Sequence, residues 1–79
     1  MMKKTIRLAT INDVRDFVDI TRKYDMDIDL ASGRYVVDGK SIMGIFSLDL
    51  LQPITLTAYG DEKECDEFFK ETERFDTKE

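Results

Sequence analysis

The sequence predicts an α+β fold in which four antiparallel strands form one sheet and three helices cover one of its faces. Short segments with alternating apolar and polar residues are typical of strands that expose one face to water, as antiparallel strands do. Between them lie segments whose apolar residues recur at helical spacing. The predicted order is β-α-β-β-α-β-α, and right-handed crossovers place the helices together, which gives an open-faced sandwich.

The first half of the chain is predicted to form three strands and one helix. Alternation around Ile6 and Leu8 indicates a strand over residues 4–10, after which Asn12 or Asp13 can cap a helix through a side-chain oxygen. A second alternating segment covers residues 26–30. A tight turn at Ser32-Gly33 returns the chain as a third strand over residues 34–37. The helix is expected to bury Val14, Phe17, Val18, Thr21 and Tyr24.

The second half adds a short helix, the clearest strand and a final helix. Ser41 precedes an apolar segment over residues 42–48 and is the expected N-cap of a short helix. This segment holds more apolar residues than one face needs, so we expect Met43 and Phe46 to stay partly exposed. Residues 54–59 form the last strand, and Asp61 begins the last helix. That helix should bury Cys65, Phe68, Phe69, Thr72 and Phe75.

Length and composition limit the chemistry. The 79 residues are enough for one domain, over residues 1–79. The chain has 12 Lys and Arg against 17 Asp and Glu, a formal net charge of −5 and scattered basic residues, which argues against nucleic acid as a partner. It has no histidine and a single cysteine, so we expect no metal site, no cofactor and no imidazole catalysis.

The composition also indicates the cellular compartment of the protein. No apolar run approaches the roughly 18 residues of a membrane span, and the N-terminus lacks the apolar region of a secretory signal. The unpaired Cys65 fits a reducing compartment, so we expect a cytoplasmic protein in which this thiol is buried and structural. Asp27 and Asp29 alternate with apolar residues and are expected on the exposed sheet face as solubilising charges.

The segment Gly39-Lys40-Ser41-Ile42-Met43-Gly44-Ile45-Phe46-Ser47-Leu48 resembles the regulatory-serine segment of HPr, the small phosphocarrier of the bacterial phosphoenolpyruvate-dependent sugar phosphotransferase system. Lys23-Tyr24-Asp25 resembles the end of the first HPr helix. Ile54-Thr55-Leu56 and Gly60-Asp61-Glu62 resemble the last HPr strand and the start of its last helix. The resemblance spans nearly the whole chain and implies the HPr-type open-faced β-sandwich.

One connection departs from the family. HPr carries a histidine, followed by Arg-Pro, between its first strand and first helix, and this histidine relays phosphate. Here Thr10-Ile11-Asn12-Asp13-Val14 makes the same connection, is several residues shorter, and contains neither element. The family's phosphorelay residues therefore match no position of this chain. The resemblance implies an HPr fold that does not carry out the HPr reaction. Crh-type members of the family also lack the histidine and keep only the serine function, and this chain resembles them in that respect.

The regulatory serine is retained at Ser41. In the Gram-positive family this serine is phosphorylated by HPr kinase/phosphorylase, and the phospho-form binds the catabolite control repressor. A phosphate at a helix N-terminus is favoured by up to about 2 kcal/mol. The resemblance thus implies a non-enzymatic regulatory protein with a protein partner. Its predicted partner-binding residues are Lys40, Ile42, Met43 and Phe46.

Three alternatives remain open. Ser41 can be a plain N-cap, which is worth about 1 kcal/mol. The chain can be a phosphocarrier that uses another acceptor, such as Asp13 or Thr10. It can also be a diverged HPr fold with an unrelated protein partner. Enzyme I with labelled phosphoenolpyruvate tests the second alternative, and Ser41→Ala tests the third.

Overall fold

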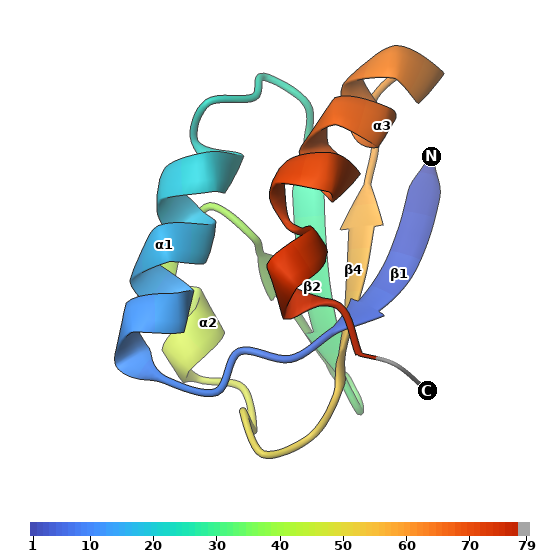
Figure 1. Cartoon of the computed structure of the whole chain (residues 1–79). Coiled ribbons are helices and arrows are strands. Elements are labelled where there is room, and N and C mark those ends of the chain that lie inside the picture. Colours follow the sequence, from blue (N-terminus) through green and yellow to red (C-terminus); the bar gives the residue numbers. More distant parts are fainter. Residues whose placement is uncertain (78–79) are drawn as a thin grey trace.

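A computed structural model describes residues 1–77. One sheet carries the helices on one of its sides, and its other side is open (Figure 1). The elements are β1 (Met2–Ile6), α1 (Ile11–Thr21), β2 (Ile28–Ser32), β3 (Tyr35–Asp38), α2 (Ile42–Phe46), β4 (Ile54–Ala58), α3 (Glu62–Glu71) and a 3₁₀ turn (Glu73–Phe75).

The sheet has the strand order β1-β4-β2-β3, and every neighbouring pair is antiparallel. The predicted α+β open-faced sandwich and its element order are therefore confirmed. The alternation also sets the faces, because Ile28 and Leu30 are buried under the helices. Asp27 is exposed and Asp29 half-buried on the opposite face, where the sequence places them.

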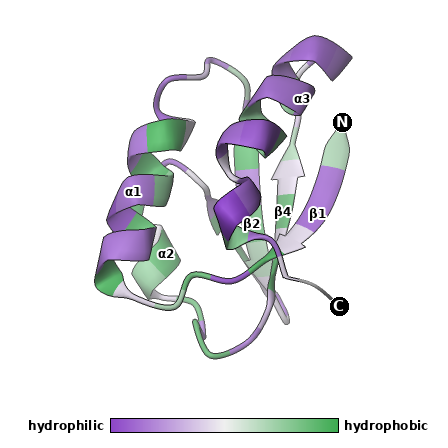
Figure 2. Ribbon diagram, in the orientation of Figure 1, coloured by the Kyte–Doolittle hydropathy of each residue, from purple (hydrophilic) through white to green (hydrophobic). Residues whose placement is uncertain are grey.

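One hydrophobic core lies between the sheet and the helices. The ring of Phe17 on α1 meets the rings of Phe68 and Phe75 edge-on, at centroid distances of 6.2 and 5.8 Å. Cys65 is fully buried, as expected, with its Sγ 3.6 Å from the Ala58 carbonyl oxygen. Hydrophilic residues dominate the outer sides of α1 and α3 (Figure 2). These two helices therefore present the amphipathic character that their sequence spacing predicts.

The element boundaries differ from the sequence prediction in several places; the second strand, for example, covers Ile28–Ser32 rather than residues 26–30. The first strand covers Met2–Ile6 rather than residues 4–10, because the Arg7 N–H leaves β4 and donates to the Phe75 carbonyl at 2.8 Å. Thr10, not Asn12 or Asp13, caps α1. The turn after β2 falls on residues 33–34, where Gly33 has a φ of 59° that glycine adopts without strain.

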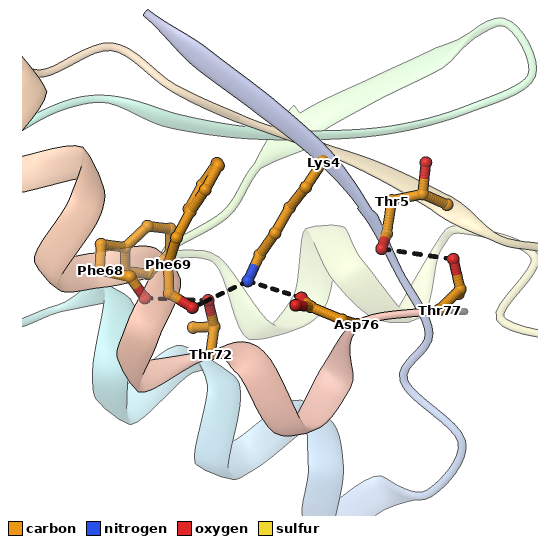
Figure 3. Close-up of polar contacts among 7 residues, drawn as sticks. All are labelled: Lys4, Thr5, Phe68, Phe69, Thr72, Asp76 and Thr77. Carbon is orange, nitrogen blue, oxygen red and sulfur yellow. Dashed lines mark hydrogen bonds and ion pairs between the residues drawn. The ribbon is translucent and has the colours of Figure 1, made fainter. Parts of the chain in front are cut away.

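The C-terminal segment closes the outer edge of β1. The Thr77 N–H donates to the Thr5 carbonyl at 3.2 Å, and Ile6 bridges Asp76. Lys4 lies at the centre of this contact (Figure 3). Its ammonium donates to the Phe69 carbonyl at 3.0 Å and pairs with the Asp76 carboxylate at 2.6 Å. Lys4 thereby joins the first strand, the last helix and the segment that follows it.

Candidate functional site

Ser41 stands at the start of α2 as the predicted N-cap. Its backbone is extended (φ −105°, ψ 109°), and its Oγ accepts the Gly44 N–H at 3.1 Å. The Ser41 carbonyl accepts the Ile45 N–H at 3.0 Å, which closes the first turn. The side chain is half-buried. Ser41 is thus both a structural cap and a hydroxyl at the protein surface.

Close packing fixes this turn. A Cβ at Gly44 would lie 3.2 Å from the Ser41 Oγ and 3.3 Å from the Val37 Cβ. Such contacts are tighter than ordinary van der Waals contacts, so the absent side chain lets α2 approach β3. At the other end of the helix, the Ser47 hydroxyl donates back to the Gly44 carbonyl at 2.6 Å.

The exposed face of α2 is apolar. Met43 is 76% exposed and Phe46 is 40% exposed, as the surplus of apolar residues predicts. Ile42 is half-buried and packs against the edge of the core. Figure 2 shows α2 coloured as hydrophobic over most of its length, in contrast to α1 and α3. We call Ser41, Ile42, Met43 and Phe46 the α2 surface.

The Lys40 side chain is bound within the chain. Its ammonium donates to the Tyr24 carbonyl at 2.5 Å, and the Arg22 Nε donates to the Lys40 carbonyl at 3.3 Å. Lys40 therefore ties the loop before Ser41 to the C-terminal end of α1. The predicted role of Lys40 in partner binding stays a prediction.

A polar network continues from this tie to α3. The Tyr24 hydroxyl and the Lys23 ammonium both donate to the Glu71 carboxylate. Burial, followed by the hydrogen bond to Glu71, raises the pKa of Tyr24. The bonds from Lys23 and Tyr24 lower the pKa of Glu71. The network holds the end of α1 against α3 while its carboxylate is ionised.

The start of α1 is organised differently. The Thr10 Oγ accepts the Asp13 N–H at 3.0 Å, and the Asp13 carboxylate accepts the Ala9 N–H at 3.0 Å. The Arg74 guanidinium lies 3.8 Å from Asp13 and 2.8 Å from Asp16. Two side chains of the chain itself thus occupy this helix start, and one of them is an anion. Neither Thr10 nor Asp13 has an unengaged functional group.

Known proteins share this geometry at the level of the fold. No protein-family model and no curated protein matches the sequence. Among solved structures, the crystal structure of HPr-C-His from Thermoanaerobacter tengcongensis superposes with a TM-score of 0.74 at 29% identity, over 90% of this chain and 89% of that one. The chain is HPr-like.

Two further structures have the same fold. The phosphocarrier protein HPr from Bacillus anthracis str. Ames gives a TM-score of 0.73 at 22% identity, over 96% of both chains. A histidine-containing phosphocarrier protein of Mycoplasma gives 0.70 at 16% identity, over 90% of both chains. These two comparisons establish the shared fold. This HPr-like chain has no histidine among its 79 residues.

Ile11 and Leu51 are among the further apolar side chains that the structure exposes. Ile11, the first residue of α1, is 67% exposed, and Leu51, in the connection after α2, is 81% exposed. Ile11 is not among the residues expected to be buried in this helix, which begin with Val14. Leu51 lies in an aperiodic loop, where its carbonyl accepts the Arg7 guanidinium at 3.2 Å.

Residues 1–77 of the HPr-like chain show no group of three His, Cys, Asp or Glu that could hold a metal ion. Within the same residues, every buried side-chain nitrogen and oxygen has a hydrogen-bond partner. No helix in this range is both long and apolar enough to span a membrane.

Proposed function

We propose that this HPr-like chain is a non-enzymatic regulatory protein of the sugar phosphotransferase system. In this proposal it does not carry phosphohistidine, it acts in the cytoplasm, and it is switched by phosphorylation of Ser41. The observation that carries the proposal is a contrast between two helix starts. Thr10 and Asp13 fill the start of α1 in a chain without histidine, whereas Ser41 presents a half-buried hydroxyl beside exposed apolar residues at the start of α2.

The chemistry of Ser41 supports a switch. A phosphate on the Oγ carries nearly two negative charges and lies next to the unpaired backbone N–H groups of the first helical turn. The local field of the helix start favours that charge. The phosphate also changes the surface beside Met43 and Phe46 from neutral to anionic without moving the core. A partner that contacts both parts then distinguishes the two forms of the protein.

The partner follows from the same surface. Exposed Met and Phe side chains are suited to an apolar contact, and the phosphate is suited to an Arg or Lys of the partner. We therefore propose a protein partner of the catabolite-control regulator type, and HPr kinase/phosphorylase as the modifying enzyme. Lys40 contributes by positioning the loop before Ser41, since its ammonium is bound to the Tyr24 carbonyl.

The direct test is to incubate the chain with ATP and an HPr kinase/phosphorylase and then to measure its intact mass. We expect one phosphate per chain, lost in Ser41→Ala and retained in the matched control Ser47→Ala, which lies at the other end of the same helix. An unmodified chain beside a fully modified HPr control would contradict the switch. A pull-down with and without phosphate on Ser41 then tests the partner, and equal recovery would support an unrelated one.

The competing phosphocarrier function meets a carboxylate at the start of α1. The Thr10 hydroxyl accepts a helix amide, as the Ser41 hydroxyl does, but the Asp13 carboxylate also lies there, accepting the Ala9 amide beside Arg74. A phosphate on Thr10 would lie next to this anion, and a phosphate on Asp13 would disturb its bond to Ala9. We expect enzyme I and labelled phosphoenolpyruvate to leave no label on the chain, and label on Asp13 or Thr10 would replace the proposal with this alternative.

A further inference from the structure

The two edges of the sheet differ in what covers them. Backbone hydrogen bonds from residues 75–77 close part of the β1 edge, from the Arg7 N–H to Phe75 and from the Thr77 N–H to Thr5. The opposite edge is β3, and its only strand partner within residues 1–77 is β2. In the same part of the chain no hydrogen bond reaches the outer side of Val36. An uncovered edge is a template for an added strand.

The register shows which groups this edge offers. Ser32 pairs with Tyr35 across a two-residue turn, so the bonded pairs recur at every second residue along the hairpin. The Gly39 N–H donates to the Ile28 carbonyl at 2.7 Å, in agreement with that alternation. The N–H and C=O of Val36 therefore point away from the sheet. The Val36 side chain is 63% exposed, and that of Tyr35 is 71% exposed.

The open face beside this edge is acidic. Asp29 lies directly opposite Asp38, and Ala31 lies opposite Val36. Asp27 and Tyr59 complete a shallow hollow of about 390 Å³ on this side. None of the ion pairs within residues 1–77 involves these three aspartates. Two like charges opposite each other on adjacent strands destabilise a sheet, so a cation placed between them relieves a repulsion.

We propose that the β3 edge and the acidic face beside it, together the β3 surface, dock an extended segment of another protein that carries Lys or Arg at alternate positions. The backbone of the segment would pair with Val36, in the manner of strand addition. Side chains of a strand alternate between faces, so every second residue of the segment lies on the face of Asp29 and Asp38. The apolar side chain of Val36 receives the aliphatic parts of these basic residues.

A second copy of the chain fits this edge less well. Pairing β3 with β3 places two acidic open faces side by side, and each copy already carries a net charge of −5. The β3 surface is also separate from the α2 surface, because α2 lies on the helix-covered side of the sheet (Figure 1). The two surfaces can therefore be tested independently.

The test uses the full chain labelled with nitrogen-15 and a capped peptide, Lys-Val-Lys-Thr-Lys-Val. We expect the amide chemical shifts of residues 35–38 and 29–31 to change on addition of the peptide and to reach saturation. Binding should weaken as the salt concentration rises, and a peptide with Glu in place of each Lys should not bind. Methylation of the alternate backbone nitrogens that face β3 should abolish binding while the charge of the peptide is kept.

Two double variants separate local recognition from net charge. Asp29→Asn with Asp38→Asn should weaken binding by roughly three- to tenfold. The Asp38 carboxylate accepts the Lys40 N–H at 2.8 Å, and the amide oxygen of the substituted side chain can still accept it, so the turn is kept. Asp19→Asn with Asp66→Asn changes the net charge equally at two exposed helical positions and should leave binding unchanged.

Several results would overturn the proposal. One is that the peptide causes no saturable change in amide chemical shifts. Another is that the changes are centred on α1 and α2. A third is that both double variants weaken peptide binding equally. Shifts at Val36 that depend on protein concentration without peptide would assign the edge to a second copy. Ser41→Ala should not alter peptide binding, so a failure here leaves the Ser41 proposal untouched, and the reverse also holds.

Discussion

The two helix starts on the helix-covered side of the molecule solve the same physical problem in different ways. At α1, Thr10 caps the helix and Asp13 reaches back to the Ala9 amide, while Arg74 neutralises the carboxylate. At α2, the Ser41 hydroxyl alone caps a helix of five residues. The first start is closed by an internal anion. The second leaves room for an external one.

The difference separates fold from reaction. An HPr-like fold brings both helix starts to the same side of the sheet, but only a start without its own carboxylate favours a phosphate. In this chain, the start of α1 holds an internal carboxylate, and the start of α2 has only the Ser41 hydroxyl. The proposed Ser41 switch rests on this contrast.

The largest expected effect concerns packing beneath Ser41. Gly44→Val should lower the free energy of unfolding by about 1–3 kcal/mol, because the new side chain meets the Ser41 Oγ and Val37. Urea denaturation followed by circular dichroism measures it. Met43→Val is the matched control, since it places the same β-branched residue at the neighbouring, exposed position. Helix propensity favours Val over Gly but disfavours Val in place of Met, so a larger loss in Gly44→Val than in Met43→Val reports close packing. An unchanged or raised stability of Gly44→Val would contradict the prediction.

The two helix caps should contribute different amounts to the free energy of unfolding, and both contributions should be smaller than the effect of Gly44→Val. Thr10→Ala should cost about 1 kcal/mol, since it removes the cap of an eleven-residue helix. Ser41→Ala should cost about 0.5 kcal/mol, because α2 spans only five residues. Urea midpoints of the two variants, with Ser47→Ala as the reference, give the comparison. A Ser41 cap that costs as much as the Thr10 cap would remove the energetic distinction between the two starts.

The smallest effect concerns pH and the network of Lys23, Tyr24 and Glu71, which joins the end of α1 to α3. Lys23 and Tyr24 lower the pKa of Glu71, so the ionised carboxylate stabilises the fold above its ordinary pKa of about 4.3. That contribution is lost as the pH falls from about 5 through the lowered pKa. The Glu71 side chain is 37% exposed, which makes the contribution small.

Denaturation series between about pH 3 and pH 6 should therefore show a shallower pH dependence for Glu71→Gln than for the unmodified chain. Glu67→Gln is the matched control, because Glu67 is exposed on the same helix and forms no ion pair within residues 1–77. Identical slopes for the two variants would show that the network does not couple to folding.

The sequence predicts the fold well because its evidence is periodic. Alternation around Ile28 and Leu30 and helical spacing around Phe17 and Phe68 each reflect burial on one side of an element. The same evidence predicts Ser41 as a cap and the exposure of Met43 and Phe46. These features depend on neighbours within one turn of a helix.

Features that join distant segments could not be predicted. Leu8 alternates like a strand residue, yet it lies beyond β1, since the Arg7 amide bonds to Phe75. This partner lies far along the chain, and periodicity carries no information about it. The Thr10 cap is different, because its contacts are local: Thr10 accepts the Asp13 amide, and Asp13 accepts the Ala9 amide. The three-residue spacing of Thr10 and Asp13 is the sequence signal that could have identified this cap.

The contact of β1 with the C-terminal segment bears on the order of folding. The β2–β3 hairpin has a two-residue turn, and hairpins of this kind form in about 1–10 μs. β1 instead pairs with β4 and with residues 75–77, so its completion requires closure of a loop that spans most of the chain. The hairpin therefore needs the shortest loop closure in the sheet, and the pairing of β1 with β4 needs the longest. Lys4, which bonds both Phe69 and Asp76, adds a side-chain contact between the two ends of that long loop.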